Sequence, residues 1–141
     1  MFLLDTNVVS EIRKIGAGRA DPTFTDWARS FDGSAAFVSV ITLHELEHGV
    51  LLIERRDPQG VGPLRQWLDV DVRDAFGDRV LSVDSTVAKL AAALHVPDSA
   101  PINDAYLAAT ALVHNLTMVT RNVADFNRFE DLDILNPWDA P

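Results

Sequence analysis

Residues 2–14 read Phe-Leu-Leu-Asp-Thr-Asn-Val-Val-Ser-Glu-Ile-Arg-Lys, an apolar run that meets an aspartate and passes directly into a helical pattern. Residues 2–5 predict a short buried strand, because a brief apolar run bounded by polar residues is typical of a strand covered on both faces. Residues 6–14 predict a helix whose valines and isoleucine share one side. Asp5 therefore stands where a strand passes into a helix, the beginning of a β-α unit.

The same alternation continues along the chain. Short apolar strands that alternate with helices predict an α/β fold, with a mostly parallel sheet covered on both faces. We find no internal repeat or linker and expect a single domain over residues 1–141. Further strands are predicted at residues 35–41, 79–83, 116–120 and 133–135, and further helices from Pro22 to about Phe31, from Thr42 to about Arg56, from Pro63 to about Phe76, from Ser85 onward and over 103–114.

Composition excludes several kinds of site. The chain has no cysteine, so disulfides, thiolate zinc sites and cysteine nucleophiles are absent. Apolar residues make up 48% of the chain, but none of their runs approaches the ~20 residues of a membrane helix. The early Asp5 also argues against a signal peptide, so we expect a cytoplasmic protein without membrane association.

The net charge of −9 argues against a general nucleic-acid binder, because phosphate contacts normally recruit an excess of lysine and arginine. Such acidity is either a solvated surface or, in part, a group of carboxylates that binds a cation. A bound metal ion neutralises such carboxylates and can then face a phosphate. A phosphodiester substrate therefore remains open.

Three carboxylates follow strand ends. Ligands of parallel α/β sheets bind beyond the carboxyl ends of the strands. Asp5 ends the first strand, Glu45 lies in the first turn of the helix after the second, and Asp125 lies just past the fourth. Asp104 opens the helix that leads into the fourth strand, so the strand-end rule does not place it.

Each of these residues also has an ordinary structural interpretation. Asp5 and Asp104 can cap the helices that they precede or open, Thr42 and Glu45 fit a capping box, and Asp125 can be a loop residue. Four independent caps at comparable topological positions are less expected than one site. Carboxylates are the ligands that Mg²⁺ and Mn²⁺ prefer, and such ions promote attack of water on phosphodiesters.

Four stretches of the chain resemble the motifs of PIN domains, especially the VapC-type toxins of type II toxin–antitoxin systems. They occur in family order and span nearly the whole chain. The stretches are residues 3–11 (LLDTNVVSE), 39–49 (SVITLHELEHG), 103–111 (NDAYLAATA) and 120–126 (TRNVADF).

The resemblance implies that Asp5, Glu45, Asp104 and Asp125 form the acidic quartet of a ribonuclease site. Asp5 and Asp104 match the positions most often treated as ligands of Mg²⁺ or Mn²⁺. Glu45 is a further candidate ligand, and Asp125 a candidate that acts through a water molecule. Polar positions that support the site in relatives correspond to Thr6, Asn7, Thr120 and Asn122, which can also serve as backbone caps.

The resemblance also implies a PIN-like three-layer α/β/α sandwich with a five-stranded sheet. The implied activity is metal-dependent cleavage of single-stranded RNA or exposed tRNA loops, with tRNA or mRNA as substrate. The implied partners are a VapB-type antitoxin, a second copy in a homodimer, and both in a toxin–antitoxin hetero-oligomer. Glu11 matches an additional acidic position of some relatives, and a solvent-facing helix residue is an equal interpretation.

Three alternative functions remain open. Residues 44–48 (His-Glu-Leu-Glu-His) form an H-E-x-x-H string, which on a helix can bind Zn²⁺ in a metallopeptidase, with His95 and His114 left as candidates for the third ligand. A phosphatase with Asp5 as nucleophile normally needs a second aspartate two residues later, where this chain has Asn7. The third alternative is a non-catalytic module whose acidic site binds basic residues of a partner.

Charge also suggests how partners bind. An arginine of the antitoxin is expected to reach the carboxylates, because arginine forms bidentate bonds with them. The amphipathic helices at 6–14 and 42–56 are candidate partner faces. Candidates for steering RNA phosphates, with surface solubility as the alternative role, are Arg13, Lys14, Arg19, Arg55 and Arg56.

Overall fold

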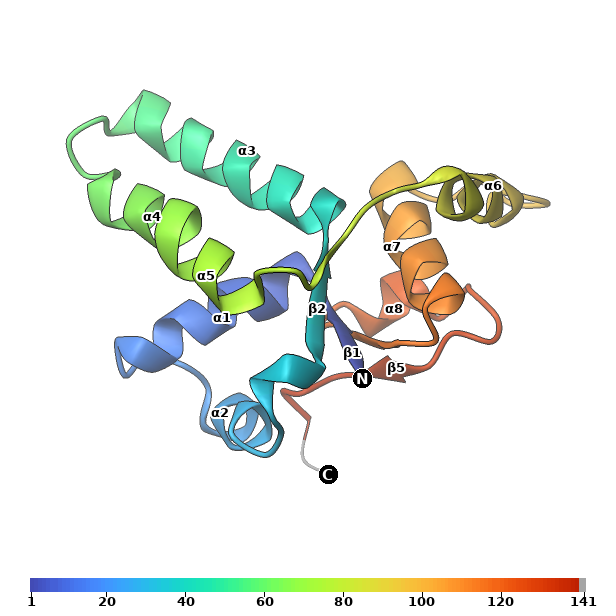
Figure 1. The fold of residues 1–141 in the computed structure, drawn as a ribbon, viewed down its shortest axis with the longest axis horizontal. Coiled ribbons are helices and arrows are strands. Elements are labelled where there is room, and N and C mark those ends of the chain that lie inside the picture. The colour runs from blue at the N-terminus through green and yellow to red at the C-terminus, as the bar shows by residue number, and fades with distance from the viewer. Residues whose placement is uncertain (140–141) are drawn as a thin grey trace.

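In the computed structural model, which describes residues 1–139, strands and helices alternate along the chain (Figure 1). All five predicted strands are present, most of them shorter than the apolar runs that predicted them. In chain order the elements are β1 (Phe2–Leu4), α1 (Thr6–Gly16), α2 (Pro22–Ala28), the 3₁₀ turn η1 (Gly33–Ala35), β2 (Ala36–Ser39), α3 (Val40–Arg56), α4 (Gly62–Gln66), the π-helical segment η2 (Trp67–Val72), α5 (Arg73–Phe76), β3 (Val80–Leu81), α6 (Ser85–Ala93), α7 (Ile102–Val113), β4 (Thr117–Val119), α8 (Val123–Phe126) and β5 (Ile134–Leu135).

The five strands form one sheet in the order β3-β2-β1-β4-β5, and every neighbouring pair is parallel. The predicted mostly parallel sheet is therefore confirmed and is parallel throughout. β1 is central: Leu3 is in register with Phe37 of β2 on one side and Met118 of β4 on the other. The residue after β1, Asp5, consequently lies at the middle of the carboxyl edge of the sheet.

Alternating side chains of the central strands enter two separate cores. Leu4 and Val119 pack with the layer formed by α1 to α5, whereas Leu3 and Met118 pack with α7 and α8 around Phe126. Figure 1 shows these two groups of helices on opposite sides of the strands. The predicted α/β/α sandwich is confirmed, and its two cores explain why the strands are apolar on both faces.

The second strand ends earlier than predicted, and α3 begins at Val40 instead of Thr42. The Oγ atom of Ser39 accepts a hydrogen bond of 3.0 Å from the backbone N–H of Ile41, so serine is the N-cap. The apolar run at 35–41 concealed this boundary, because it continues from the strand through Val40 and Ile41, the apolar first residues of the helix. The predicted capping box between Thr42 and Glu45 is wrong, which leaves the Glu45 carboxylate available for other contacts.

Two other helices differ from the predicted ones. The segment predicted as one helix from Pro63 to Phe76 contains the π-helical η2, and apolar spacing in the sequence does not distinguish an α turn from a wider π turn. Helix α2 ends at Ala28, before the predicted Phe31, whose ring packs on Phe2 (centroids 4.9 Å apart). Helix α6 begins at Ser85, as predicted, and Asp84 caps it, with its Oδ1 atom 2.9 Å from the backbone nitrogen of Val87. None of the helices within residues 1–139 combines the length and hydrophobicity that a membrane span requires.

Candidate active site

Asp5 is held rigidly at the centre of the carboxyl edge, with only 7% of its surface exposed. Its backbone nitrogen donates to the Val119 carbonyl oxygen (2.9 Å), which continues the ladder of β4. Its Oδ1 atom accepts from the backbone N–H of Thr6 (2.8 Å), and its Oδ2 atom accepts from Asn7 Nδ2 (3.1 Å) and Thr120 Oγ1 (2.7 Å). Asp5 is therefore a helix cap, as the structural interpretation predicted, and also a fixed carboxylate at the site.

Thr120 and Asn7 connect the loop after β4 to the start of α1. The buried Thr120 hydroxyl donates to Asp5 and accepts from the backbone N–H of Asn122 (3.0 Å). The side-chain oxygen of Asn7 accepts from the backbone N–H of Arg121 (3.1 Å). Together with Thr6, these contacts place all four predicted supporting residues in one network, Asn122 through its backbone.

The other three carboxylates converge on this edge from separate helices. Glu45, in the second turn of α3, accepts a hydrogen bond of 2.8 Å from the Thr6 hydroxyl, which places it beside Asp5. Asp104 lies in the first turn of α7 and Asp125 in α8. Asp104 does not cap its helix, whose N-cap residue is Pro101. The start of α7 thus reaches the edge that the strand-end rule alone did not assign to it.

The carboxylates are close enough to affect one another's protonation. The pKa of Asp104 is raised to about 6, first by desolvation and then by the negative charges of Asp125, Asp5 and Glu45, and the positive charge of Arg128 opposes this rise. Burial also raises the pKa of Asp5, aided by Glu45 and opposed mainly by the hydrogen bond from Thr120. Mutual repulsion among four carboxylates favours a bound cation.

The donor set fits Mg²⁺ or Mn²⁺, since it consists of carboxylate oxygens. Across residues 1–139, no group of three acidic or histidine side chains is arranged to hold a metal ion. Mg²⁺ usually keeps several waters beside one or two carboxylates, so a site for it does not require three protein ligands. Asp5 and Asp104, from the central strand end and the start of α7, are suited to supply those carboxylates.

Glu11 has a structural contact that the sequence did not indicate. It is 7% exposed, and its Oε2 atom accepts from the backbone N–H of Asp21 (3.0 Å), while Oε1 pairs with Lys14 (3.1 Å). The Asp21 hydrogen bond is the main cause of its lowered pKa. The solvent-facing interpretation of Glu11 is wrong, because its carboxylate fixes the start of α2 against α1.

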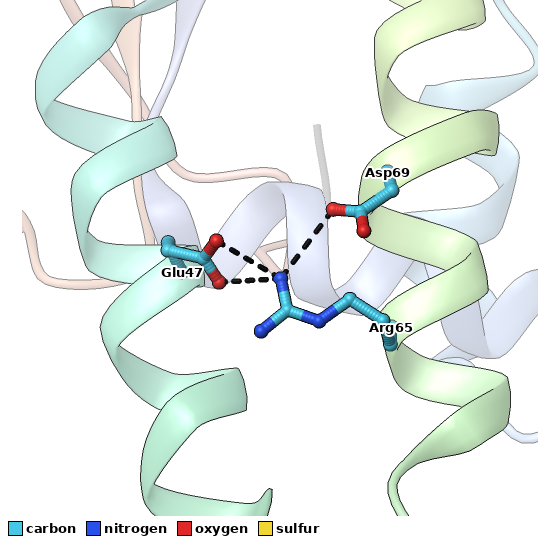
Figure 2. Close-up of polar contacts among 3 residues, drawn as sticks. All are labelled: Glu47, Arg65 and Asp69. Atoms are coloured by element: carbon cyan, nitrogen blue, oxygen red, sulfur yellow. Dashed lines mark hydrogen bonds and ion pairs between the residues drawn. The ribbon is translucent and has the colours of Figure 1, made fainter.

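The H-E-x-x-H string does not form a zinc site within the described chain. His44 and His48 are exposed, with ring centroids 6.4 Å apart, and no third ligand joins them in residues 1–139. Figure 2 shows Glu47 bound to Arg65 of α4, whose Nη1 atom lies 2.9 and 2.6 Å from the two carboxylate oxygens. Glu45 bonds to Thr6, as described above, and His95 accepts from the backbone N–H of Ala100.

One cation that was not predicted from the sequence acts on the carboxylates. Arg128 lies two residues after the fourth motif, and its positive charge acts on Asp104. Of the cations named from the sequence, Arg55 is ten residues beyond Glu45, or roughly 15 Å along α3 at the usual helical rise. Arg13 lies over the Trp67 ring. The position of Arg128 three residues after Asp125 was the signal that could have identified it.

Comparison with known proteins gives a consistent result. The PIN domain family matches residues 2–132. The toxin FitB of Neisseria gonorrhoeae is 33% identical over 144 residues, which cover 98% of this chain and 99% of FitB. The VapC ribonuclease Y4jK of Sinorhizobium fredii is 32% identical over 144 residues, which cover 99% of each chain.

Among solved structures, the crystal structure of FitAcB from Neisseria gonorrhoeae matches with a TM-score of 0.85 and 31% sequence identity. The match covers 98% of this chain and 99% of that chain. The similarity therefore extends over both layers of helices and the whole carboxylate edge.

Two buried threonines allow the hydrogen-bond network to be tested. Thr120→Val removes a donor to Asp5 and an acceptor for Asn122, so it should lower the free energy of unfolding by about 2–3 kcal/mol. Thr42→Val should be neutral or slightly stabilising, because the buried Thr42 hydroxyl has no hydrogen-bond partner within residues 1–139. Urea denaturation measures both, and equal losses in the two variants would contradict this account.

The raised pKa of Asp104 makes stability depend on pH. The folded protein binds this proton more tightly than the unfolded chain, so stability falls as pH rises from 3.8 to about 6. In metal-free buffer, Asp104→Asn should therefore be more stable than the unmodified chain at pH 7.5, with the difference absent below about pH 4. Asp78→Asn, at an exposed aspartate, is the control. A stabilisation of Asp104→Asn that did not vary with pH would refute the electrostatic explanation.

Proposed function

Because this chain belongs to the PIN domain family, we propose that it is a metal-dependent endoribonuclease with Asp5, Glu45, Asp104 and Asp125 as its catalytic carboxylates. The observation that carries the proposal is their convergence: three of them raise the pKa of the fourth, Asp104. The similarity to a VapC ribonuclease agrees with RNA as the substrate. Single-stranded RNA, including exposed tRNA loops or mRNA, is the class that we propose, cleaved in the cytoplasm.

Asp5 and Asp104 are the proposed direct ligands of Mg²⁺ or Mn²⁺. When bound, the ion lowers the pKa of water and neutralises charge that develops on the phosphate. Asp5 keeps one orientation because Thr6, Asn7 and Thr120 donate to its two oxygens. Three neighbouring negative charges oppose the ionisation of Asp104, whose pKa is raised to about 6. A bound cation would favour its ionised form.

Glu45 and Asp125 have different proposed tasks. Glu45 is half-buried and accepts from Thr6 through one oxygen, so its other oxygen would be the one to bind the metal or a water on it. Asp125 lies exposed in the short helix α8 and makes no side-chain hydrogen bond within residues 1–139. It is therefore suited to accept a hydrogen bond from the attacking water and to orient that water toward the phosphorus atom.

The proposed regulator is a VapB-type antitoxin, since a relative of similar length is a toxin. Helix α1 presents the partly exposed Ile12 beside a cavity of about 210 Å³ that Trp67 and Phe76 also line. Helix α3 exposes Leu51 and Leu52. These apolar surfaces fit an amphipathic partner segment, and an arginine of that partner can reach the carboxylates as a bidentate ligand.

The activity is tested by cleavage of single-stranded RNA. The purified chain should cleave RNA with Mg²⁺ or Mn²⁺ and lose the activity in EDTA. Asp5→Asn and Asp104→Asn should each lower the rate by about 100-fold or more, because each removes a proposed ligand. His44→Ala and His48→Ala are the matched controls, because they change exposed histidines that form no hydrogen bond to the four carboxylates within residues 1–139.

Equal background cleavage in the unmodified chain and both aspartate variants would favour a non-catalytic binding module. Loss of a zinc-dependent peptidase activity in the two histidine variants, without any RNA cleavage, would favour the metallopeptidase.

The partner proposal predicts that the antitoxin protects the site. In a complex with its cognate antitoxin, RNA cleavage should cease, and replacing the arginine of the antitoxin that reaches the carboxylates by alanine should restore part of it. A complex structure with the antitoxin bound elsewhere and the carboxylate edge open would contradict the proposal. If a second copy of the chain is found bound to α3, that helix forms the homodimer interface and not the antitoxin-binding surface.

A further inference from the structure

Arg128 joins the two chain segments that supply Asp104 and Asp125. It lies three residues after Asp125, and its Nη2 atom donates to the carbonyl oxygens of Ser99 (2.7 Å) and Asp98 (3.3 Å). Those carbonyls belong to the loop that leads into α7, where Asp104 occupies the first turn. One guanidinium group therefore spans from the end of α8 to the approach of α7.

The guanidinium of Arg128 is held by hydrogen bonds but keeps N–H donors that have no partner within residues 1–139. Arg128 is exposed, and within residues 1–139 both of its hydrogen bonds come from Nη2 and it forms no salt bridge. Its guanidinium also lies 5.9 Å from the ring of the neighbouring Phe129, a contact that leaves the N–H groups free to donate. A guanidinium has five N–H donors, so Nε and Nη1 retain theirs. The two carbonyl contacts fix the direction of the group in advance, which lowers the entropy lost when it binds a ligand.

Arg128 lies near the proposed catalytic carboxylates. Its positive charge lowers the pKa of Asp104 against the effect of the three other carboxylates. The charge of Arg121, in contrast, acts on Glu11. Of these two arginines, Arg128 is therefore the one whose charge reaches the carboxylate edge, where it can bind an anion.

An acidic protein needs such a cation locally. With a net charge of −9, the chain as a whole repels RNA, so binding depends on individual cations near the site. The metal proposed above faces the scissile phosphate. An arginine at the rim, with free donors in a planar fork, matches the two unesterified oxygens of a neighbouring phosphate.

We propose that Arg128 is a substrate-binding residue whose guanidinium holds a backbone phosphate of RNA next to the one that is cleaved. The inference rests on the proposed ribonuclease function, because it assigns a subsite to that same carboxylate edge. It gives Arg128 a role different from that of the catalytic carboxylates: it contributes to RNA affinity and register, and the carboxylates to the chemical step.

The test compares Arg128→Gln, Arg128→Lys and the unmodified chain, with Arg73→Gln as the control. Arg73 is exposed and lies in α5, which leads to the start of β3 at the opposite edge of the sheet, and its replacement changes the net charge equally. Binding of a labelled, non-hydrolysable analogue of a single-stranded RNA oligonucleotide is measured by fluorescence anisotropy at several salt concentrations in Mg²⁺. The values of kcat and KM for cleavage are measured in parallel.

Arg128→Gln should weaken RNA binding and raise KM by about tenfold, with kcat changed much less. The slope of log affinity against log salt should become shallower by about 0.7, the value for one phosphate of a single strand. Arg128→Lys should keep that slope because it keeps the charge, and should recover part of the affinity. Arg73→Gln should leave both unchanged.

A purely structural role for the bonds to Ser99 and Asp98 gives a different result. Arg128→Gln would then lower the melting temperature and kcat, and the salt slope would stay that of the unmodified chain, which would overturn the proposal. Failure of the ribonuclease proposal is visible separately as RNA binding without metal-dependent cleavage, and in that case the binding arm still tests Arg128. Absence of RNA binding by the unmodified chain would overturn both.

Discussion

The structure depends on the burial of one carboxylate, Asp5, at the centre of a parallel sheet. An ionised group in this position is costly unless hydrogen bonds replace the water that it loses. Donors from Thr6, Asn7 and Thr120 provide them, and two of these residues come from the helix that Asp5 caps. The third comes from the end of β4, so β4 must pair with β1 in its observed register. The cap of α1, the register of β4 against β1 and the geometry of the site therefore all depend on the hydrogen bonds of Asp5.

The negative charges gathered at this site destabilise the metal-free protein, and that cost is informative about function. Asp104 is partly buried, and the negative charges of three other carboxylates raise its pKa. A protein under selection for stability alone would favour an uncharged residue here. Retention of charge at a destabilising position is common where a site binds an ion. The cost to the metal-free chain and the affinity for a cation have the same origin, which is the repulsion among carboxylates.

The sequence predicted the sheet well because its signals are local. Short apolar runs, helix periodicity and strand-end aspartates are visible within a few residues, and they located Asp5, Glu45 and Asp125. Asp104 needed the family resemblance, because only the packing of α7 shows where that helix begins relative to the sheet. A similar limit explains the error at α3: the sequence indicated Thr42 as part of a capping box, whereas the structure shows that Ser39 accepts the capping hydrogen bond and that the Thr42 hydroxyl has no partner within residues 1–139. The exposed histidines of the H-E-x-x-H string needed a third ligand that sequence alone could not exclude.

Charge is the property for which a summed value is least informative. The net charge of −9 argues against RNA binding until the positions of the charges are known. Several of the cations are then accounted for, with Arg65 bound to Glu47 and Asp69, and Lys14 bound to Glu11. Four of the 21 acidic residues, in contrast, meet at one edge of the sheet, where a metal could neutralise them. Arg128 lies at the rim of that edge, held by backbone carbonyls instead of a carboxylate, so its charge is not cancelled by a partner. An acidic chain can therefore present a locally favourable surface to a polyanion, provided that the metal and this arginine act on adjacent phosphates. The proposed dependence of RNA cleavage on metal, and a weak dependence of RNA binding on net charge, would then both follow from this arrangement.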